Sequence, residues 1–478
     1  MLFNSLDFLI FFPVVTITYF LLPQQWRWLQ LLIASCIFYM AFIPVYILIL
    51  FLTIIVDYIA GILIENAIGR RRKWLLTLSI VTNAGILAIF KYYNFFIGNL
   101  NLVFHDLPLL KIILPIGLSF HTFQAMSYTI EVYRGRQKAE RHFGIYALYV
   151  MFFPQLVAGP IERPQNVLHQ FHEKKTFDLD NLAVGLKYIL WGLFKKVVIA
   201  DRIAVATDYV FNNPQQQSSL TLIVAVLFFS FQIYCDFSGY SDIALGTARI
   251  LGFRLMKNFD APYQSRTISE FWSRWHISLS TWFRDYLYIS MGGNRVSVPR
   301  WFFNLFFVFL VSGFWHGANW TFVIWGALHG FYLIFGILID KQKRKLPVVR
   351  LPDAIKWLYR PVQIVFTFML VSFAWIFFRA ANLSDAYFII KKIFRLRNLS
   401  LGEKDLHGLP NTYLGEPLWN FVFILFLIAS LLTGDYLIKK GYAPVLQRRA
   451  KYLVYFLLIF SIIFLGTYKN NRFIYFQF

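Results

Sequence analysis

The stretch F-F-N-L-F-F-V-F-L-V-S-G-F-W-H-G-A-N-W, residues 302–320, decides the class of fold. Its apolar part leads directly into His316, which stands between two tryptophans and is followed at once by Gly317. An ionisable side chain at membrane depth is costly, and such residues usually mark a pathway or a site. Histidine is also the side chain best suited to proton transfer near neutral pH. The stretch therefore predicts a membrane-spanning helix that ends in a functional histidine.

Composition extends this prediction to the whole chain. Of 478 residues, 58% are hydrophobic and 15% are charged, whereas soluble domains average about 25% charged residues. A spanning helix needs about 20 mainly apolar residues, and roughly eleven such runs can be placed between 6–22 and 452–465. We expect an all-α, multi-pass membrane protein with one membrane domain over residues 1–478. Its motif-rich core covers about 110–340, and a less regular group of helices covers 355–478.

The net charge of +22 indicates an orientation in the membrane. Many of the basic residues fall in short connections, at 70–73, 134–141, 341–345 and 448–451. Cytoplasmic loops carry such an excess, with anionic lipid headgroups as the counter-charge, so nucleic-acid binding is not predicted. If 70–73 is cytoplasmic, three preceding spans place the N-terminus outside, and 134–141 agrees. If 341–345 is cytoplasmic as well, His316 lies toward the exterior.

Three segments depart from a simple spanning pattern. Residues 1–22 lack a basic region and a cleavage site, so we expect a retained helix and not a signal peptide. The run 151–161 is interrupted by Pro154, Gly159 and Pro160, which predicts a broken or re-entrant element. The segment 268–288 mixes tryptophans with Arg274, Arg284 and serines. That mixture predicts an amphipathic interfacial or pocket-lining helix.

Among nine histidines, His276, His316 and His329 are the candidates for chemistry. A neutral imidazole in an apolar pocket can accept a proton from a hydroxyl, which makes His316 the best general-base candidate. His276 could orient a substrate or supply a second proton-transfer group, and His329 could line the pocket. A buried histidine satisfied by hydrogen bonds is the alternative for each. His276 and His316 are far apart in sequence and follow no zinc-binding spacing, so no metal site is predicted.

Other polar residues and motifs narrow the function. Asp236 and Asp242 could form a proton relay or an ion site. The simpler interpretation is that Asp236 pairs with a cation such as Arg254 or Arg284, or caps a broken helix. Cys36 and Cys235 lie in apolar sequence, so no disulfide is expected. The chain contains no phosphate-binding G-x-x-x-x-G-K-[ST] loop and no G-x-S-x-G elbow. A nucleotide-driven pump and a serine hydrolase are therefore unsupported.

Several long motifs together resemble the membrane-bound O-acyltransferase (MBOAT) family. They are F-S-G-Y-S-D-I-A-L-G at 237–246, N-F-D-A-P-Y at 258–263, E-F-W-S-R-W-H-I-S-L-S-T-W-F-R-D-Y-L-Y-I at 270–289, G-G-N-R at 292–295 and W-H-G-A-N-W-T-F-V-I-W-G-A-L-H-G at 315–330. Within the family the chain is similar to the bacterial branch that O-acetylates alginate and peptidoglycan. The opening M-L-F-N-S-L-D-F-L-I-F-F and F-F-P-Q-L-V-A-G-P-I at 152–161 fit the same branch, and the likeness is weakest after about residue 379.

The resemblance implies a bundle around a central tunnel, with His316 as the family's characteristic histidine and His276 as its second polar position. Further pocket or tunnel residues would be His329, Asn319, Trp315, Asp236, Tyr240, Trp275 and Arg284. The implied reaction transfers an acyl group, most simply acetyl, from a cytoplasmic thioester such as acetyl-CoA to a hydroxyl of an extracytoplasmic polysaccharide. No bound cofactor is implied. The location would be the bacterial inner membrane, and the partner a separate extracytoplasmic SGNH-type transferase.

Two alternatives stay open at this point. One is D-alanyl transfer to teichoic acid from a carrier-protein thioester, within the same family. The other is a transporter or flippase for a lipid-linked glycan, which would use the same polar intramembrane residues as a pathway. The block with two histidines favours transfer over transport, because a flippase does not need it.

Overall fold

The computed structural model describes residues 1–112, 114–157, 159–343, 353–395, 402–404, 410–439, 448–468 and 474. The chain divides into two compact units. The first comprises Met1–Leu193 with Tyr240–Lys257, and the second comprises Phe194–Gly239 with Asn258–Phe478. Helix α12 (Ser219–Ile250) contributes its first part to the second unit and its last part to the first.

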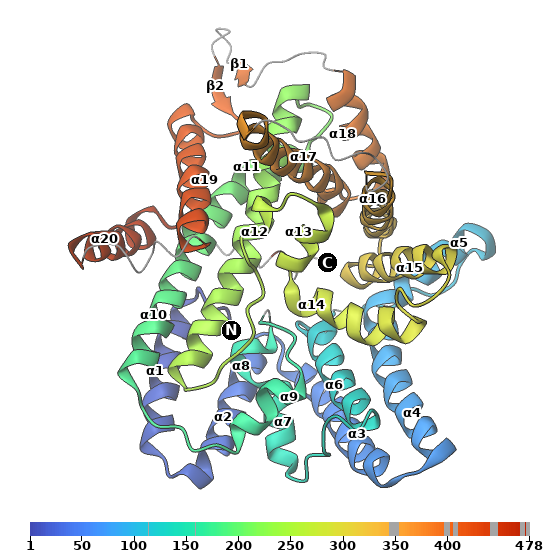
Figure 1. Ribbon diagram of the computed structural model, residues 1–478. Helices are drawn as coiled ribbons and strands as arrows, with labels where there is room; N and C mark the ends of the chain where they lie inside the picture. The colour runs from blue at the N-terminus through green and yellow to red at the C-terminus, as the bar shows by residue number, and fades with distance from the viewer. Residues whose placement is uncertain are drawn as a thin grey trace. The chain divides into compact units, whose positions relative to one another are not determined.

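Antiparallel helices joined by short connections build the first unit (Figure 1). They are α1 (Leu6–Leu21), α2 (Gln24–Met40), α3 (Ile47–Asn66), α4 (Gly69–Leu87), α5 (Tyr93–Phe104), α6 (Leu118–Tyr133), α7 (Phe143–Met151), α8 (Phe153–Leu156), α9 (Pro164–Val167) and α10 (Leu179–Leu193). A π-helical turn, Ala88–Tyr92, joins α4 to α5 without a break. The predicted interruption at 151–161 is observed, because α7 ends at Met151 and only the short α8 follows.

The second unit contains the remaining elements. They are a π-helical segment Phe194–Ala200, α11 (Asp201–Asn212), α13 (Ile268–Arg274), α14 (Ile277–Trp282), a second π-helical segment Phe283–Tyr288, α15 (Val298–His316), α16 (Trp320–Lys343), α17 (Asp353–Arg379), α18 (Leu383–Arg395), α19 (Leu418–Lys439) and α20 (Arg448–Leu465). Two short strands, β1 (Gly402–Lys404) and β2 (Pro410–Tyr413), pair with each other in antiparallel fashion.

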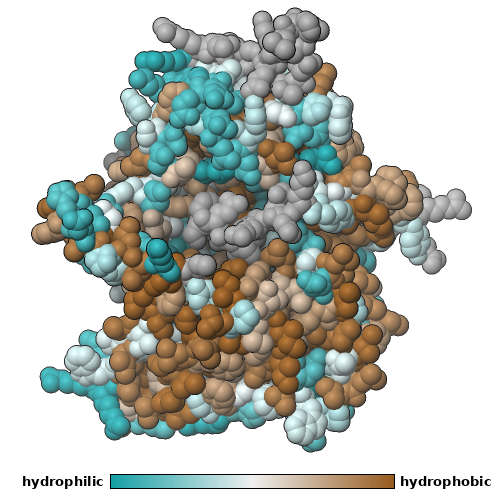
Figure 2. All heavy atoms as spheres, turned by 180° about the vertical axis from the view of Figure 1, so that it is seen from behind, coloured by the Kyte–Doolittle hydropathy of each residue, from teal (hydrophilic) through white to brown (hydrophobic). Residues whose placement is uncertain are grey.

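The structure confirms an all-α membrane fold apart from that strand pair. In the described residues, seven helices are long and apolar enough to cross a membrane, and α1 and α20 are shorter apolar helices. The expected count of about eleven is therefore not confirmed. It included the runs 6–22, 29–42, 109–130 and 452–465, whose helices α1, α2, α6 and α20 are shorter, with 16, 17, 16 and 18 residues. Figure 2 shows apolar side chains covering the helices of the first unit, with polar residues along one rim.

The predicted single helix over 268–288 is wrong in one respect: it is broken in the middle. His276 adopts a left-handed backbone conformation, with φ 43° and ψ 55°, between α13 and α14. Non-glycine residues avoid this region unless the surrounding structure holds them there. The preceding loop does so, since Ile277 N donates to Asn258 O at 2.9 Å and Asp260 N donates to Arg274 O at 3.0 Å. Because of this break, the side chain of His276 does not follow the helical periodicity of its neighbours.

Helices α15 and α16 approach each other closely through two glycines. A Cβ atom added to Gly326 would lie 2.3 Å from the carbonyl oxygen of Phe309 and 3.1 Å from Cα of Gly313. A Cβ on Gly313 would lie 2.3 Å from the carbonyl oxygen of Phe322. Small residues allow such close backbone contact between membrane helices. This contact brings together the end of α15, which carries His316, and the first turns of α16.

The basic connections of the first unit gather at one edge. The Arg72 guanidinium donates to Val132 O at 3.1 Å, and Arg141 pairs with Glu65. Figure 1 shows the α1–α2 turn at this same edge of the unit, which we name the basic edge. Two clusters that are distant in sequence thus face the same side, as the positive-inside pattern requires.

We predict that the basic edge faces the cytoplasm. Ile68, 90% exposed beside the α3–α4 turn, is a better labelling position than Ala67, which is 9% exposed. In a background with Cys36 and Cys235 replaced by alanine, Ile68→Cys should resist a membrane-impermeant maleimide in intact cells and react after lysis. The control is Phe104→Cys, because the continuous helix Gly69–Phe104 has 36 residues. That length is about 54 Å and exceeds the bilayer thickness. Labelling of Ile68→Cys but not Phe104→Cys in intact cells would reverse the orientation.

The glycine contact yields a second prediction. Gly326→Ala should force α15 and α16 apart and destabilise the protein by about 1–3 kcal/mol, the usual range for overpacking. Gly336→Ala is the matched control, because it lies in the same helix and its added Cβ would have nothing within 4 Å. There the gain in helix propensity, roughly 1 kcal/mol, should leave the unfolding temperature unchanged or raised. Equal unfolding temperatures of the two variants in detergent would refute the tight contact.

Candidate active site

His316 is the last residue of α15 and is 4% exposed. Its imidazole lies within ring contact of Trp315 (centroids 5.0 Å apart), Trp325 (5.0 Å) and Phe378 (5.3 Å). The next residue, Gly317, has its backbone against the Phe322 ring, where an added Cβ would lie 2.2 Å from a ring carbon. The helix therefore ends with its histidine enclosed by aromatic side chains from α15, α16 and α17.

Three tryptophans connect the surroundings of His316 to those of His276. The Trp325 ring stacks on Trp375 at 5.7 Å, and Trp375 contacts Trp275 at 5.2 Å. Trp275 precedes His276 in sequence, and Phe259 contacts the rings of both. Trp275, Trp325 and Trp375 are each at most 1% exposed. The two predicted histidines therefore belong to one continuous aromatic cluster within the second unit.

Asn258 orients the ring of His276. The Nδ1 atom of His276 lies 3.1 Å from Asn258 Oδ1, which also accepts from the backbone N–H of Ser278 at 3.2 Å and from its hydroxyl at 3.0 Å. Since Oδ1 is an acceptor, Nδ1 carries the proton and donates, and Nε2 of the neutral ring is an acceptor. The Phe237 ring lies edge-on to the imidazole at 4.6 Å.

Burial keeps this histidine neutral. His276 is 0% exposed and lies between α13 and α14, outside the helices long enough to span a membrane. Desolvation by burial lowers the pKa of His276 from 6.5 to about 3. At neutral pH the ring therefore presents an acceptor nitrogen.

His329 lies in α16 and has the opposite tautomer. Its Nδ1 atom accepts from the indole N–H of Trp272 at 3.2 Å, so the ring proton is on Nε2. That Nε2–H has no hydrogen-bond partner among the described residues, although the ring is fully buried. Trp325 contacts the His329 ring at 5.0 Å and the His316 ring at 5.0 Å. A buried N–H donor thus lies one tryptophan away from His316.

The cation that pairs with Asp236 is Lys196, and not Arg254 or Arg284. Lys196 Nζ lies 2.7 Å from Asp236 Oδ1 and 2.7 Å from Asp201 Oδ1, and all three side chains are at most 5% exposed. Asp236 Oδ2 also accepts from the backbone N–H of Ile474 at 2.8 Å. A buried carboxylate that is paired and hydrogen-bonded in this way has a structural explanation. These contacts of Asp236 do not support a proton relay with Asp242.

The other predicted site residues separate into two groups. Trp275 and Trp315 belong to the aromatic cluster. Asn319 holds a turn, because its Oδ1 accepts from Thr321 N at 3.0 Å and its Nδ2 donates to Ala381 O at 3.1 Å. Arg284 is largely exposed and pairs with the adjacent Asp285 at 2.8 Å. Tyr240 belongs to the first unit, where its hydroxyl lies 3.4 Å from Asn4 Oδ1.

Sequence reasoning missed Asn258, Trp272, Trp325 and Lys196. Asn258 opens the N-F-D-A-P-Y motif, so the motif carried a signal, but its contact with His276 depends on a loop that only the structure reveals. Lys196 lies outside the motifs quoted above, and local sequence does not indicate its partner. In the described part of the chain, no group of three His, Cys, Asp or Glu side chains could hold a metal ion.

The fold and the site together define a multi-pass membrane protein with a histidine-centred site. A model of the membrane-bound O-acyltransferase family matches residues 139–377. A probable alginate O-acetylase of Pseudomonas aeruginosa is 40% identical over 438 residues, covering 89% of this chain and 81% of that protein. The peptidoglycan O-acetyltransferase of Helicobacter pylori is 37% identical over 440 residues, covering 84% and 81%. The teichoic acid D-alanyltransferase of Streptococcus thermophilus is 30% identical over 307 residues, covering 58% and 70%.

The chain therefore belongs to the membrane-bound O-acyltransferase family, and it is an O-acyltransferase. This membership decides between the transferase and transporter classes in favour of transfer. It also confirms the family resemblance that was based on motifs such as those at 237–246 and 315–330.

The contacts of Asn258 give a third prediction. Asn258→Ala should leave three buried donors without their acceptor, and each such group costs roughly 1–3 kcal/mol. Ser278→Ala removes only one donor and keeps the acceptor for His276, so its cost should be about 1 kcal/mol. Thermal unfolding of the purified variants in detergent measures the difference. If Ser278→Ala were as destabilising as Asn258→Ala, Asn258 would not be the residue that holds this turn.

Proposed function

We propose that the protein transfers an acetyl group from a cytoplasmic thioester, such as acetyl-CoA, to a hydroxyl of a cell-envelope polysaccharide. The observation that carries this proposal is the enclosed His316 at the end of α15, within a family of acyltransferases. Acetyl is favoured over D-alanyl because the alginate and peptidoglycan relatives align over more than four-fifths of this chain. The D-alanyltransferase aligns over 58% of it.

His316 is the proposed general base. Its imidazole takes the proton of the attacking hydroxyl, and the hydroxyl oxygen forms a bond to the thioester carbonyl carbon. The carbon–sulfur bond then breaks, the thiolate leaves, and the imidazolium returns the proton to it. The products are an ester and a free thiol. A neutral imidazole has one nitrogen that can accept this proton.

His329 is better suited than His276 to stabilise the developing oxyanion. An oxyanion needs a hydrogen-bond donor placed in a water-poor site. The Nε2–H of His329 is such a donor, whereas the neutral His276 ring commits its N–H to Asn258. His276 then fits an accepting role, in which it positions a hydroxyl of the substrate.

The proposed setting is the bacterial inner membrane, with the basic edge in the cytoplasm and the acceptor outside. A separate extracytoplasmic transferase, of the SGNH type, would deliver the acetyl group to the polymer where the acceptor does not itself reach the membrane.

The test is His316→Ala, expressed in cells that lack their own O-acetyltransferase. Ester-linked acetate released from the envelope by mild base should fall by about 100-fold or more, the lower range for loss of a general base. His169→Ala is the matched control, because His169 is an exposed histidine whose side chain is 59% accessible, and it should retain wild-type acetylation. Both variants should appear in the membrane fraction in equal amounts.

Normal acetylation by His316→Ala would refute the general-base role. Release of D-alanine in place of acetate from wild-type cells would refute the acetyl donor while leaving acyl transfer intact.

A further inference from the structure

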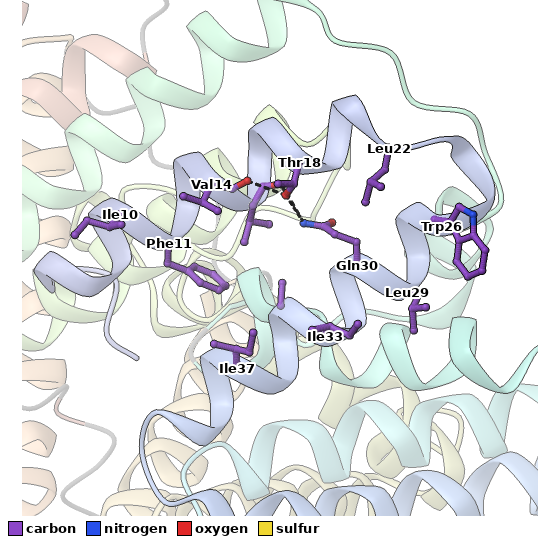
Figure 3. A pocket seen from close by; sticks show the side chains of 12 residues that line it. Ile10, Phe11, Val14, Thr18, Leu22, Trp26, Leu29, Gln30, Ile33 and Ile37 are labelled. Atoms are coloured by element: carbon purple, nitrogen blue, oxygen red, sulfur yellow. Dashed lines mark hydrogen bonds between the residues drawn. The ribbon is translucent and has the colours of Figure 1, made fainter.

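An open groove runs between α1 and α2 in the first unit. It has a volume of about 620 Å³, and we name it the α1–α2 groove (Figure 3). Its lining consists of Ile10, Phe11, Val14, Val15, Thr18, Leu22, Trp26, Leu29, Gln30, Ile33, Ala34 and Ile37. Apart from the indole N–H of Trp26, Thr18 and Gln30 are its only polar side chains. The rest of the wall is aliphatic or aromatic carbon.

The polar pair inside the groove ties the two helices together. Gln30 Nε2 donates to Val15 O at 3.1 Å and to Thr18 Oγ1 at 3.0 Å, and Thr18 Oγ1 donates to Val14 O at 2.8 Å. The N–H groups of Gln30 and the hydroxyl of Thr18 therefore find their acceptors within the protein, as Figure 3 shows. The wall offers an occupant mainly apolar contact, and its two sides are held at a fixed spacing.

The groove faces the lipid side of the unit. Ile10, Val14 and Ile33 are 67%, 55% and 51% exposed in the structure, and the chain is a multi-pass membrane protein. In that setting, side chains with such exposure contact the hydrocarbon of the bilayer. The groove is therefore open to lipid tails and not to water.

The length of the groove matches one leaflet. The lining of α1 extends from Ile10 to Leu22, which is about 18 Å at about 1.5 Å per residue. One leaflet of the hydrocarbon core is about 15 Å thick. A spanning helix of a partner protein would be about twice as long as the groove. An acyl chain that enters from the headgroup region matches its length.

The mouth of the groove is basic. It lies at the α1–α2 turn, beside Trp26, and the chain at 173–175 packs on this turn through Gln24 Nε2, which donates to Glu173 O at 3.1 Å. Arg27 contacts the chain here, Lys174 is exposed, and Lys175 Nζ pairs with Glu173 at 2.6 Å. The Arg27 guanidinium donates to the carbonyl oxygens of Leu22, Phe20 and Lys175, which fixes its charge at the mouth. Tryptophan and basic residues at this depth favour an anionic headgroup.

We propose that the α1–α2 groove binds one acyl chain of an anionic phospholipid from the leaflet at the basic edge. The headgroup phosphate would lie at the mouth beside Arg27 and Lys174. The chain would pass along Val14 and Ile33 toward Ile10. This lipid site shares no residue with the histidine cluster.

The experiment uses the full-length protein in nanodiscs of phosphatidylcholine. These contain a minor fraction of phosphatidylglycerol that carries a photoreactive diazirine midway along one acyl chain. Illumination should cross-link the probe to α1 and α2, as peptide mass mapping will reveal. Val14→Trp and Ile33→Trp fill the groove from opposite walls and should each lower this labelling by about tenfold, which corresponds to lost contact with roughly two methylene groups. Both positions are half-exposed, so neither substitution disturbs a packed core.

Ile17→Trp is the matched control, because Ile17 is 60% exposed on α1 but does not line the groove. Its labelling should equal that of the wild type. Labelling that spreads evenly over the apolar helices, or that is unchanged in both groove-filling variants, would overturn the proposal. Equal labelling by a diazirine-bearing phosphatidylcholine would overturn the requirement for an anionic headgroup. Cross-links from α1 to a second protein chain in place of lipid would show a protein occupant and would also refute it.

Discussion

The close contact between α15 and α16 is the constraint on which the candidate site depends. Gly313 and Gly326 let the two backbones approach within a distance that no side chain would permit. In a bilayer there is no hydrophobic driving force for bringing two helices together, so the contact is stabilised by van der Waals packing between the backbones. His316 follows Gly313 by less than one turn, and His329 follows Gly326 by less than one turn. The distance between the two histidines therefore depends on how closely the two glycines approach.

A second constraint acts on the polar groups of the second unit. Two of the buried histidines are oriented by a specific neighbour, His276 by Asn258 and His329 by Trp272. Buried polar groups without partners are costly, so hydrogen bonds of this kind fix both the ring orientation and the position of its proton. The result is a pair of neutral imidazoles with complementary capacity, one accepting and one donating. Two residues that are identical in sequence, both histidines, therefore differ in their hydrogen-bonding chemistry.

Much of the fold was predictable because hydropathy and charge act along the chain. The long apolar runs, the broken element after Met151 and the common side of two basic loops all follow from local sequence. The break at His276 did not, because a left-handed residue inside an apparently helical segment is imposed by the loop at 258–260. The partner of Asp236 was missed for a similar reason. Lys196 lies 40 positions earlier and reaches Asp236 through a π-helical segment that sequence periodicity does not reveal.

The candidate site was predictable in its residue types and less so in its roles. The residues at 315–330 and the second histidine followed from long motifs, which lie within the segment that the family model matches. The tautomers of His276 and His329 depend on contacts between segments that are distant in sequence. Asn319 and Arg284 belong to the same motifs, yet the structure engages one in a helix-capping turn and the other in a surface ion pair. Motif membership alone does not separate catalytic from structural positions.

The tryptophan cluster has a consequence for spectroscopy. Trp272, Trp275, Trp325 and Trp375 form a connected set whose neighbouring ring centroids are 5.2–5.7 Å apart. Indoles this close couple their electronic transitions and transfer excitation among themselves. The near-ultraviolet circular dichroism and the fluorescence of the protein therefore contain an intrinsic signal from the ring packing around His316. A ligand that enters between these rings should change the near-ultraviolet circular dichroism and the fluorescence, so its binding can be measured without an added label.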